Sequence, residues 1–401
     1  MAERFGYKEL SAALRGHSAA LRCITEYQPA GGVGDKVFPP TYEGGRYATE
    51  TRILDGGEIA DCVLLDSVQS QANRMELALL EAHRAKRTNI PLLIARFDQE
   101  SLVKKFAVTS LEAPHRAADA IFRDSLYAGK MFRKSEKGRL LDTADTRNAS
   151  GLFGLCPTAL LFGLWDSTGP RGGLGTKFQR AIVSEIVGIS ATIGVKTSSR
   201  IDPAQIMRGA GPLYPRKNGG DTTPEWTLDS ADGAKKLGKE GKPSEANHGN
   251  VLPEITAGGL TIARAKQTTV ISLTALRRLR FPLGGKSDSN SDVDTVARTV
   301  LAALGLAAAS LTRDESADLR SRCHLIATST PTWELIDKPG QAPVQFHLSG
   351  GEALALLNES VAAAKSADLP WEGEIELRPS DDLVELVRRS QKLASEAVGE
   401  A

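Results

Sequence analysis

The stretch Leu64-Leu-Asp-Ser-Val-Gln-Ser-Gln-Ala-Asn-Arg-Met75 is the most informative guide to the fold, because it opens an amphipathic helix. Asp66 or Ser67 can cap the first turn by accepting a hydrogen bond from a backbone N–H group. The apolar residues recur at helical spacing and form a stripe for a core: Val68, Ala72, Met75, Leu79 and Ala82. A helix that buries one stripe needs a sheet or a second helix to pack against.

The polar side of this helix carries more hydrogen-bonding groups than helix propensity favours. These groups fall within two turns: Ser67, Gln69, Ser70, Gln71, Asn73 and Arg74. Hydroxyl and amide groups beside a guanidinium suit the sugars and phosphates of a nucleic-acid backbone. A solvated helix face with no ligand is the alternative interpretation, and the helix alone does not separate the two.

Strands and helices alternate irregularly along the rest of the chain. The sequence predicts strands over 21–27, 91–97, 158–165, 178–193, 260–276 and 324–329. It predicts helices from 293 onward, over 380–397 and over 109–127, unless Pro114 restarts the last of these. Residues 128–150 are polar, and residues 202–250 are rich in Gly, Pro, Lys, Asp and Asn with little periodicity. This order predicts an α+β fold in which helices pack on one face of a sheet.

The bulk composition is that of a globular protein, with 41% hydrophobic, 25% charged and 5% aromatic residues among 401. Lys+Arg 50 against Asp+Glu 49 gives a net charge of +1, so nucleic-acid binding would need local basic patches. The four cysteines form no Cys-x-x-Cys pair and are expected to be buried thiols. We expect no signal peptide, an apolar stretch at 300–311 too short to span a bilayer, and a cytoplasmic location.

A glycine-rich turn is the segment best suited to bind phosphate. Gly172, Gly173 and Gly175 allow a close backbone approach to an anion, and positive charge comes from Arg171, Lys177 and Arg180. The turn is not a P-loop, because Thr176 separates Gly175 from Lys177 and a β-branched segment follows. A nucleotide-binding enzyme is therefore disfavoured, and a glycine-rich hairpin without a ligand remains the structural alternative.

Other polar groups give weaker indications. His115 and Arg116 with Asp119 could serve acid/base chemistry, and Asp166 could bind a metal ion, although a turn-capping role suits Asp166 better. The densest basic stretch on the predicted strands is either a nucleic-acid path or a solvated face: Arg264, Lys266, Arg277, Arg278 and Arg280. No metal ion or cofactor is expected, since the six histidines are scattered without ligand spacing.

Four segments in one order resemble a known family. They begin with the helix-opening stretch quoted above and continue with Ala113-Pro-His-Arg-Ala-Ala-Asp-Ala-Ile-Phe-Arg-Asp-Ser125, Gly154-Leu-Cys-Pro-Thr-Ala-Leu-Leu-Phe-Gly-Leu-Trp-Asp-Ser167 and Gly172-Gly-Leu-Gly-Thr-Lys-Phe-Gln-Arg-Ala-Ile-Val-Ser-Glu185. The chain resembles the RAMP-superfamily backbone protein (Cas-seven group, Csb-one family) of type I-G, formerly I-U, CRISPR Cascade complexes. The resemblance covers most of residues 20–330.

The resemblance implies an RNA-recognition-motif-like (ferredoxin-like) palm with a finger insertion and a β-hairpin thumb. The palm would comprise residues 1–97, 151–201 and 251–401, the last part with a C-terminal helix; the finger would comprise 98–150, and the thumb or flexible arm 202–250. Guide-binding elements would be the 67–74 helix and the 172–180 turn. The RNA-binding residues expected from the motifs and the basic segments together are Ser67, Gln69, Ser70, Gln71, Asn73, Arg74, His115, Arg116, Arg171, Gly172, Gly173, Gly175, Lys177, Arg180, Arg264 and Lys266.

The family grips CRISPR RNA without catalysis, as a helical oligomer that presents the spacer for pairing with target DNA in antiviral defence. The implied partners are CRISPR RNA, the target DNA strand paired to the guide, other copies of the chain and other Cascade subunits, with no membrane. A related RAMP branch cleaves target RNA with a loop aspartate and a divalent metal. A metal-dependent endoribonuclease using Asp166 or Asp119 is thus the main alternative.

Limited proteolysis tests the expected arm at residues 202–250. The segment has too few apolar residues for a core of its own, so it should be cut first in the free protein and more slowly in the RNA complex. Mass spectrometry of the fragments locates the cuts. Equal cutting rates in both states would contradict an arm that is ordered by RNA or a neighbouring subunit.

Overall fold

The computed structural model describes residues 5–167, 176–216, 220, 222–230 and 235–397. The chain divides into two compact units. The larger is built from residues within 1–99, 105–192 and 260–383, and the smaller from residues within 100–104, 193–259 and 384–401. Each unit is therefore assembled from segments that are distant in the sequence.

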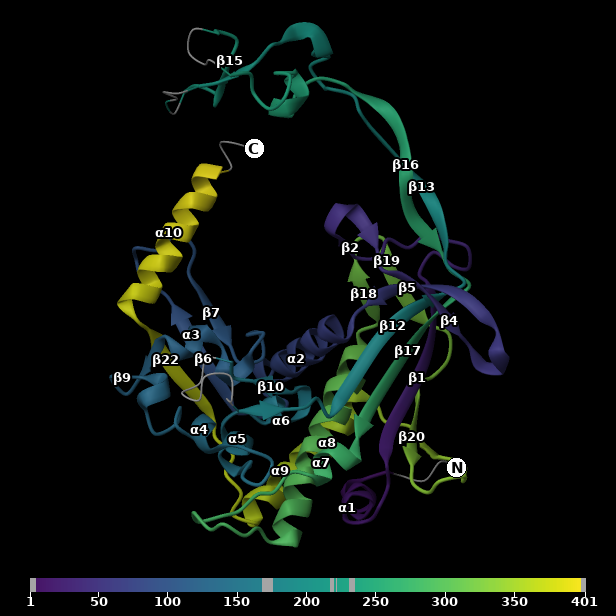
Figure 1. Cartoon of the computed structure of the whole chain (residues 1–401), viewed down its shortest axis with the longest axis vertical. Helices are drawn as coiled ribbons and strands as arrows, with labels where there is room; N and C mark the ends of the chain where they lie inside the picture. The colour runs from purple at the N-terminus through teal and green to yellow at the C-terminus, as the bar shows by residue number, and fades with distance from the viewer. Residues whose placement is uncertain (1–4, 168–175, 217–219, 221, 231–234, 398–401) are drawn as a thin grey trace. The chain divides into compact units, whose positions relative to one another are not determined.

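The larger unit is organised by a nine-stranded sheet with the main order β18-β19-β1-β17-β12-β5-β4, to which β20 and β21 are added beside β1. The pairings within it are antiparallel, and the sheet curls into a half-barrel (Figure 1). The strands are β1 (Ala20–Pro29), β4 (Thr49–Ile53), β5 (Ile59–Asp66), β12 (Ile182–Ile189), β17 (Arg264–Ser272), β18 (Ala317–Arg320), β19 (Cys323–Ala327), β20 (Thr332–Ile336) and β21 (Val344–Phe346). The predicted α+β class is confirmed, and the sheet is consistent with an RNA-recognition-motif-like palm.

Residue alternation along β17 explains why this sheet has one covered and one open face. Ala265, Gln267, Thr269 and Ile271 are buried, whereas the residues between them are partly or fully exposed. Successive side chains of a strand point to opposite faces, so the buried set marks the side on which helices pack.

Helices cover the buried face of the sheet and one another. α2 (Val68–Arg84) and α8 (Ser291–Asp314) contact β12 and β17 respectively and lie against each other, and α8 also packs on α9 (Gly350–Ser366) and α1 (Tyr7–Arg15) (Figure 1). Gly305 allows α8 its close approach to β17, because a Cβ there would lie 3.0 Å from Ile271 Cδ1. The amphipathic pattern from residue 293 thus predicted the central helix of the unit correctly.

Most of the apolar surface of α8 is buried by packing within the protein. The whole helix, which extends beyond the expected stretch 300–311, is long and apolar enough to cross a membrane by length and composition alone, a test that a buried core helix also passes. However, 89% of the most apolar part of the helix is buried within the protein. Asn290 caps the helix by accepting hydrogen bonds from the N–H groups of Asp292 and Val293.

A second sheet in the larger unit has the order β7-β6-β22-β8-β9. Its strands are β6 (Leu92–Phe97), β7 (Phe106–Thr109), β8 (Ser125–Tyr127), β9 (Lys130–Met131) and β22 (Glu374–Pro379). β22 pairs in parallel with β6, so a strand near the C-terminus completes a sheet begun early in the chain. The expected finger segment 98–150 supplies three strands of this sheet and the short helix α4 (Leu140–Thr143).

Two sequence-based element assignments are wrong. The predicted 109–127 helix is a turn, the 3-10 helix η3 (Arg116–Ala118) and the short α3 (Ala120–Arg123), although the Glu112 carboxylate does accept from the Thr109 N–H group. Pro114 stands two residues after Glu112, and proline disfavours the α conformation in the residue before it, here Ala113, so the helix cannot continue from this capping box. The predicted 158–165 strand is instead α6 (Pro157–Phe162) followed by β10 (Leu164–Trp165), because a short apolar run fits a buried helix as well as a strand.

The smaller unit contains a two-stranded ribbon of β13 (Thr192–Arg200) and β16 (Val251–Thr261). Between these strands the described chain forms β14 (Tyr214–Pro215), β15 (Trp226–Thr227) and the 3-10 helices η5 (Arg208–Ala210) and η6 (Pro243–Ala246). Buried Asp202 joins the two ends of this segment: its carboxylate accepts hydrogen bonds from the N–H groups of Ala204 at 2.9 Å and of Gly249 at 2.6 Å. The unit also includes most of α10 (Asp381–Ala397), which confirms the C-terminal helix.

Candidate nucleic-acid interface

The polar side of α2 divides into an exposed part and a buried part. Ser67 caps the helix, its Oγ accepting from the Ser70 N–H group at 3.2 Å. Gln69 and Asn73 are exposed, with no side-chain hydrogen bond to another described residue, so their amides are open to a ligand. Gln71 and Arg74 instead point toward the sheet.

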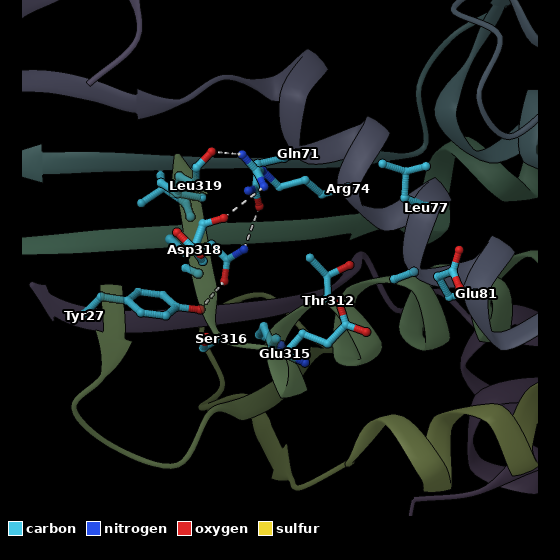
Figure 2. A pocket seen from close by; sticks show the side chains of 15 residues that line it. Tyr27, Gln71, Arg74, Leu77, Glu81, Thr312, Glu315, Ser316, Asp318 and Leu319 are labelled. Atoms are coloured by element: carbon cyan, nitrogen blue, oxygen red, sulfur yellow. Dashed lines mark hydrogen bonds between the residues drawn. The ribbon is translucent and has the colours of Figure 1, made fainter. Parts of the chain in front are cut away.

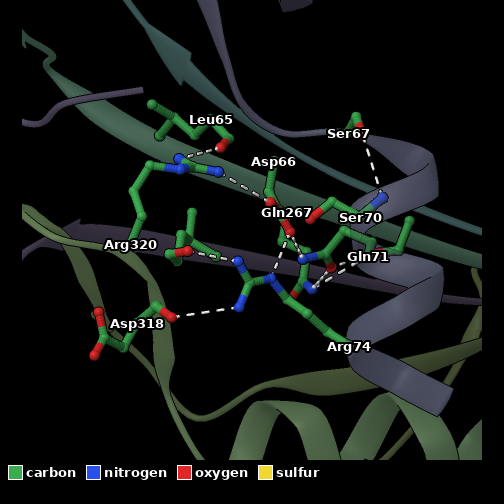
Figure 3. A network of polar contacts seen from close by, with 11 residues as sticks. Leu65, Asp66, Ser67, Ser70, Gln71, Arg74, Gln267, Asp318 and Arg320 are labelled. Atoms are coloured by element: carbon green, nitrogen blue, oxygen red, sulfur yellow. Dashed lines mark hydrogen bonds and ion pairs between the residues drawn. The ribbon is translucent and has the colours of Figure 1, made fainter. Parts of the chain in front are cut away.

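A buried carboxylate at the end of β5 organises the inward-pointing groups (Figure 3). The Asp66 side chain is 0% exposed; its Oδ2 accepts from Gln71 Nε2 at 2.6 Å and from Arg74 Nε at 2.9 Å. Arg320 of β18 donates to Asp66 Oδ1 at 3.4 Å and to the Leu65 carbonyl at 2.8 Å. Two guanidinium groups and one amide thus compensate a charge that would be costly to bury alone.

Gln71 extends this network across the central strands. Its Oε1 accepts from Ser184 Oγ of β12 at 3.0 Å and from Gln267 Nε2 of β17 at 2.7 Å. Gln267 Oε1 accepts in turn from the Tyr27 hydroxyl of β1 at 3.0 Å, and burial raises the pKa of Tyr27 to about 12. Five strands are therefore linked to α2 through polar groups that have partners.

A cavity of about 250 Å³ lies beside this network (Figure 2). It is lined by α2, the end of α8 and β18, and it carries both signs of charge: Arg74 and Arg313 against Glu81, Glu315 and Asp318. Arg74 is also held by the Leu319 carbonyl at 2.7 Å. A polyanion would meet carboxylates here, which makes this cavity a poor phosphate site.

Arg116, a predicted RNA contact, is buried in an ion pair with α2. Its Nε and Nη2 donate to the two carboxylate oxygens of Glu76 at 2.7 and 2.8 Å, and Nη1 donates to the Gly163 carbonyl at 3.0 Å. Burial raises the pKa of Glu76 to about 7, an effect that the Arg116 guanidinium opposes. His115, by contrast, is exposed and open to a ligand.

The aspartates of the nuclease alternative have structural partners. Asp166 is buried and lies 2.9 Å from Arg133, which also binds Asp142 at 2.6 Å. Asp119 caps α3 by accepting from the Ile121 N–H group at 3.0 Å. Within the described ranges no group of three or more His, Cys, Asp or Glu residues could hold a metal ion, and all four cysteines are buried and unpaired, as expected.

Two short strands border the glycine-rich turn. Arg171, Gly172, Gly173 and Gly175 lie outside the described residues. On either side of them, β10 pairs with β11 (Lys177–Phe178), and Trp165 stands opposite Lys177. Gly163 starts this hairpin with φ of +91°, and a Cβ there would lie 3.0 Å from Arg180 Cγ, so both conformation and space require glycine.

Lys177 and Arg180 are exposed beside this hairpin. The Lys177 ammonium lies 5.7 Å from the centroid of the Trp165 ring. Partial burial and the nearby Arg116 lower the pKa of Arg180, while Glu76 opposes the shift. Sequence reasoning selected both cations but missed Trp165, since a lone tryptophan in an apolar segment is expected to be core.

Arg264 and Lys266 lie on the open face of the large sheet. Arg264 pairs with Glu26 of β1 at 3.4 Å. Lys266 stands opposite Glu26 on β1 and opposite Val187 on β12, the two strands that flank β17. Other arginines on this face are neutralised by ion pairs, Arg22 with Glu334 and Arg52 with Glu185. Lys266 is thus the cation of the central strands that has no ion pair within the described part of the chain.

Comparison with known proteins gives a match to one family model over part of the chain. Residues 21–193 match the family model of the CRISPR-associated protein GSU0053 (Cas_GSU0053). The match runs from β1 to the start of β13 and so contains both α2 and the β10–β11 hairpin. Among curated proteins, no relative matches the chain. The family match supports a CRISPR-associated role.

Removing the central carboxylate should destabilise the larger unit. Asp66→Ala removes the carboxylate that two arginines and one amide share as an acceptor, and breaking a buried pair typically costs about 3–5 kcal/mol. Urea denaturation monitored by circular dichroism measures the free energy of unfolding. Asp61→Ala, on an exposed position of the same strand, should cost less than about 1 kcal/mol. Equal losses in both variants would contradict the role assigned to Asp66.

The Glu76–Arg116 pair predicts a pH-dependent effect. In Arg116→Met the unpaired carboxyl keeps a folded-state pKa raised by burial, so the variant loses stability as pH rises through that pKa. The destabilisation should be about 3–5 kcal/mol at pH 8 and clearly smaller at pH 5. Denaturation curves between these values test this. The double variant Arg116→Met/Glu76→Gln should lose this pH dependence. Parallel pH profiles for the single and double variants would exclude the Glu76 carboxyl as its cause.

Proposed function

We propose, on the premise of the CRISPR-associated match over residues 21–193, that this chain is the repeated backbone subunit of a type I-G Cascade complex. In this role it oligomerises along CRISPR RNA and presents the spacer for pairing with target DNA in antiviral defence. Its partners are CRISPR RNA, the target strand paired to the guide, further copies of itself and other Cascade subunits. The complex acts in the cytoplasm.

The observation that carries the proposal is the location of the match within the fold. The matched residues contain the strands β1, β5 and β12 of the curled sheet, the polar start of α2 and the strands that border the glycine-rich turn. A palm-like antiparallel sheet with hydrogen-bonding groups and cations at its margin supports binding to a nucleic-acid backbone.

The distribution of charge supports gripping by local contacts. The net charge is +1, so no long-range field attracts RNA. Exposed Lys177 and Arg180 and half-buried Lys266 offer cations, and exposed Gln69 and Asn73 offer amides. Such groups can bind phosphates and sugars without reading bases, as a subunit that accepts any spacer requires.

The surroundings of the aspartates favour a non-catalytic role over a RAMP-type endoribonuclease. Asp166 is paired with Arg133, and Asp119 caps a helix, so neither carboxylate points freely toward a substrate. Incubation with guide, complementary RNA and Mg²⁺ separates the two functions. The backbone proposal predicts intact RNA, and regularly spaced cuts that Asp166→Asn abolishes would establish the nuclease.

Salt-dependent guide binding tests the predicted phosphate contacts. Filter binding is measured for two unrelated guides over a salt series with wild type, Lys177→Ala and Arg180→Ala. Each lost phosphate contact should weaken binding about equally for both guides and reduce the slope of log K against log salt by about 0.7.

Lys365→Ala is the matched control, because it removes one exposed lysine on α9. This control should leave affinity and slope unchanged. If both test variants also behave like wild type, the β10–β11 hairpin has only a structural role, and the guide path must be sought along Arg264, Lys266 and Arg277.

A further inference from the structure

A cavity of about 310 Å³ lies beside the β10–β11 hairpin, outside the polar network of α2. Its volume falls within the range typical of small-molecule sites. Apolar side chains such as Leu160, Phe178 and Leu279 form much of its wall, and the polar side chains among them include Lys177, Gln179 and Arg278.

The lining of this cavity carries charge of one sign only. It carries two cations, Lys177 and Arg278, and no carboxylate. Three further cavities in the described part of the chain all contain carboxylates: those at Glu81, at Asp381 and at Asp288. The lining residues therefore attract an anion and include no carboxylate that would repel it.

Arg278 is held weakly, unlike the two arginines nearest to it in the chain. It is exposed, and its Nη1 donates to Gln179 Oε1 at 3.4 Å. Arg277 donates to the Ser18 carbonyl at 2.7 Å, and Arg280 pairs with Asp294 at 3.0 Å. Arg278 can thus turn to a ligand without breaking a strong contact.

An exposed tryptophan adjoins the same cations. Trp165 is 58% exposed, in a chain whose aromatic residues make up only 5% of the sequence. Its neighbour across the hairpin is Lys177, which both lines the cavity and lies over the indole ring. An indole in water beside a cation is a surface on which a nucleobase can stack.

We propose that Trp165, Lys177 and Arg278 form a subsite for one nucleotide of single-stranded RNA. The phosphate lies between Lys177 and Arg278, and its base stacks on the exposed part of Trp165. Every base has a π-face, so the subsite accepts any base but requires that a base be present. This inference rests on the proposed function and adds to it a stacking contact on Trp165 and a role for Arg278, whose basic stretch the sequence left as either a nucleic-acid path or a solvated face.

The test uses the full chain, a guide RNA, and the same guide with abasic nucleotides replacing its bases. Trp165→Leu should weaken binding of the normal guide by about 5- to 150-fold and should leave binding of the abasic guide unchanged. Trp165→Phe is the matched control and should retain most of the affinity, because it keeps an aromatic surface. Unchanged thermal melting of each variant shows that folding is intact.

Arg278→Gln should weaken both guides and reduce the salt slope by about 0.7, whereas Arg278→Lys should restore most of the slope. Competition with adenosine monophosphate is a further test. The subsite binds one nucleotide of a chain that is held at many other contacts, so free nucleotide at micromolar concentration should not displace the guide. Displacement at that concentration would overturn the proposal in favour of a mononucleotide site.

The outcomes separate this inference from the proposed function. If the wild type binds no guide RNA, both fail. If the wild type binds and Trp165→Leu and Arg278→Gln bind equally well, the subsite is wrong while the backbone function stands. Loss of affinity by Trp165→Leu that is equal for normal and abasic guides would exclude stacking.

Discussion

The structure of the larger unit depends on the burial of one carboxylate. Asp66 ends β5 immediately before α2 begins, and its charge is compensated by Arg74 from the helix and Arg320 from β18. A buried charge requires such partners in fixed positions, so the network fixes how α2 lies on the sheet. Gln71 and Gln267 continue the same constraint across the central strands.

A second buried ion pair links α2 to the candidate RNA site. Glu76, two turns after the cap, holds Arg116, and Arg116 holds the Gly163 carbonyl where the β10–β11 hairpin starts. The cations and the exposed Trp165 at this hairpin are therefore attached to the same helix that Asp66 orients. This arrangement follows the general requirement that binding groups be supported by residues that are themselves fixed.

Much of the fold could be predicted from the sequence, whereas the site could be predicted only in part. The helix beginning at Val68, the central helix with Val300 and Leu304, and the α+β class followed from periodicity. Short apolar runs such as 158–165 were misassigned, because helix and strand periods cannot be distinguished over so few residues. Strand β22 was missed because its partner β6 lies almost 300 residues earlier, and no local pattern records such a pairing.

The sequence by itself determined the kinds of group present: a polar helix start, a glycine-rich turn between cations, and a net charge near zero. The tertiary structure decided which of these groups remain available to a ligand. Arg74 and Arg116 look like Lys177 and Arg278 in the sequence, yet the first two neutralise buried carboxylates and the last two line a cavity without one. The reason is physical, since whether a guanidinium stabilises the fold or binds a phosphate depends on the nearest carboxylate, and only folding determines where that carboxylate lies.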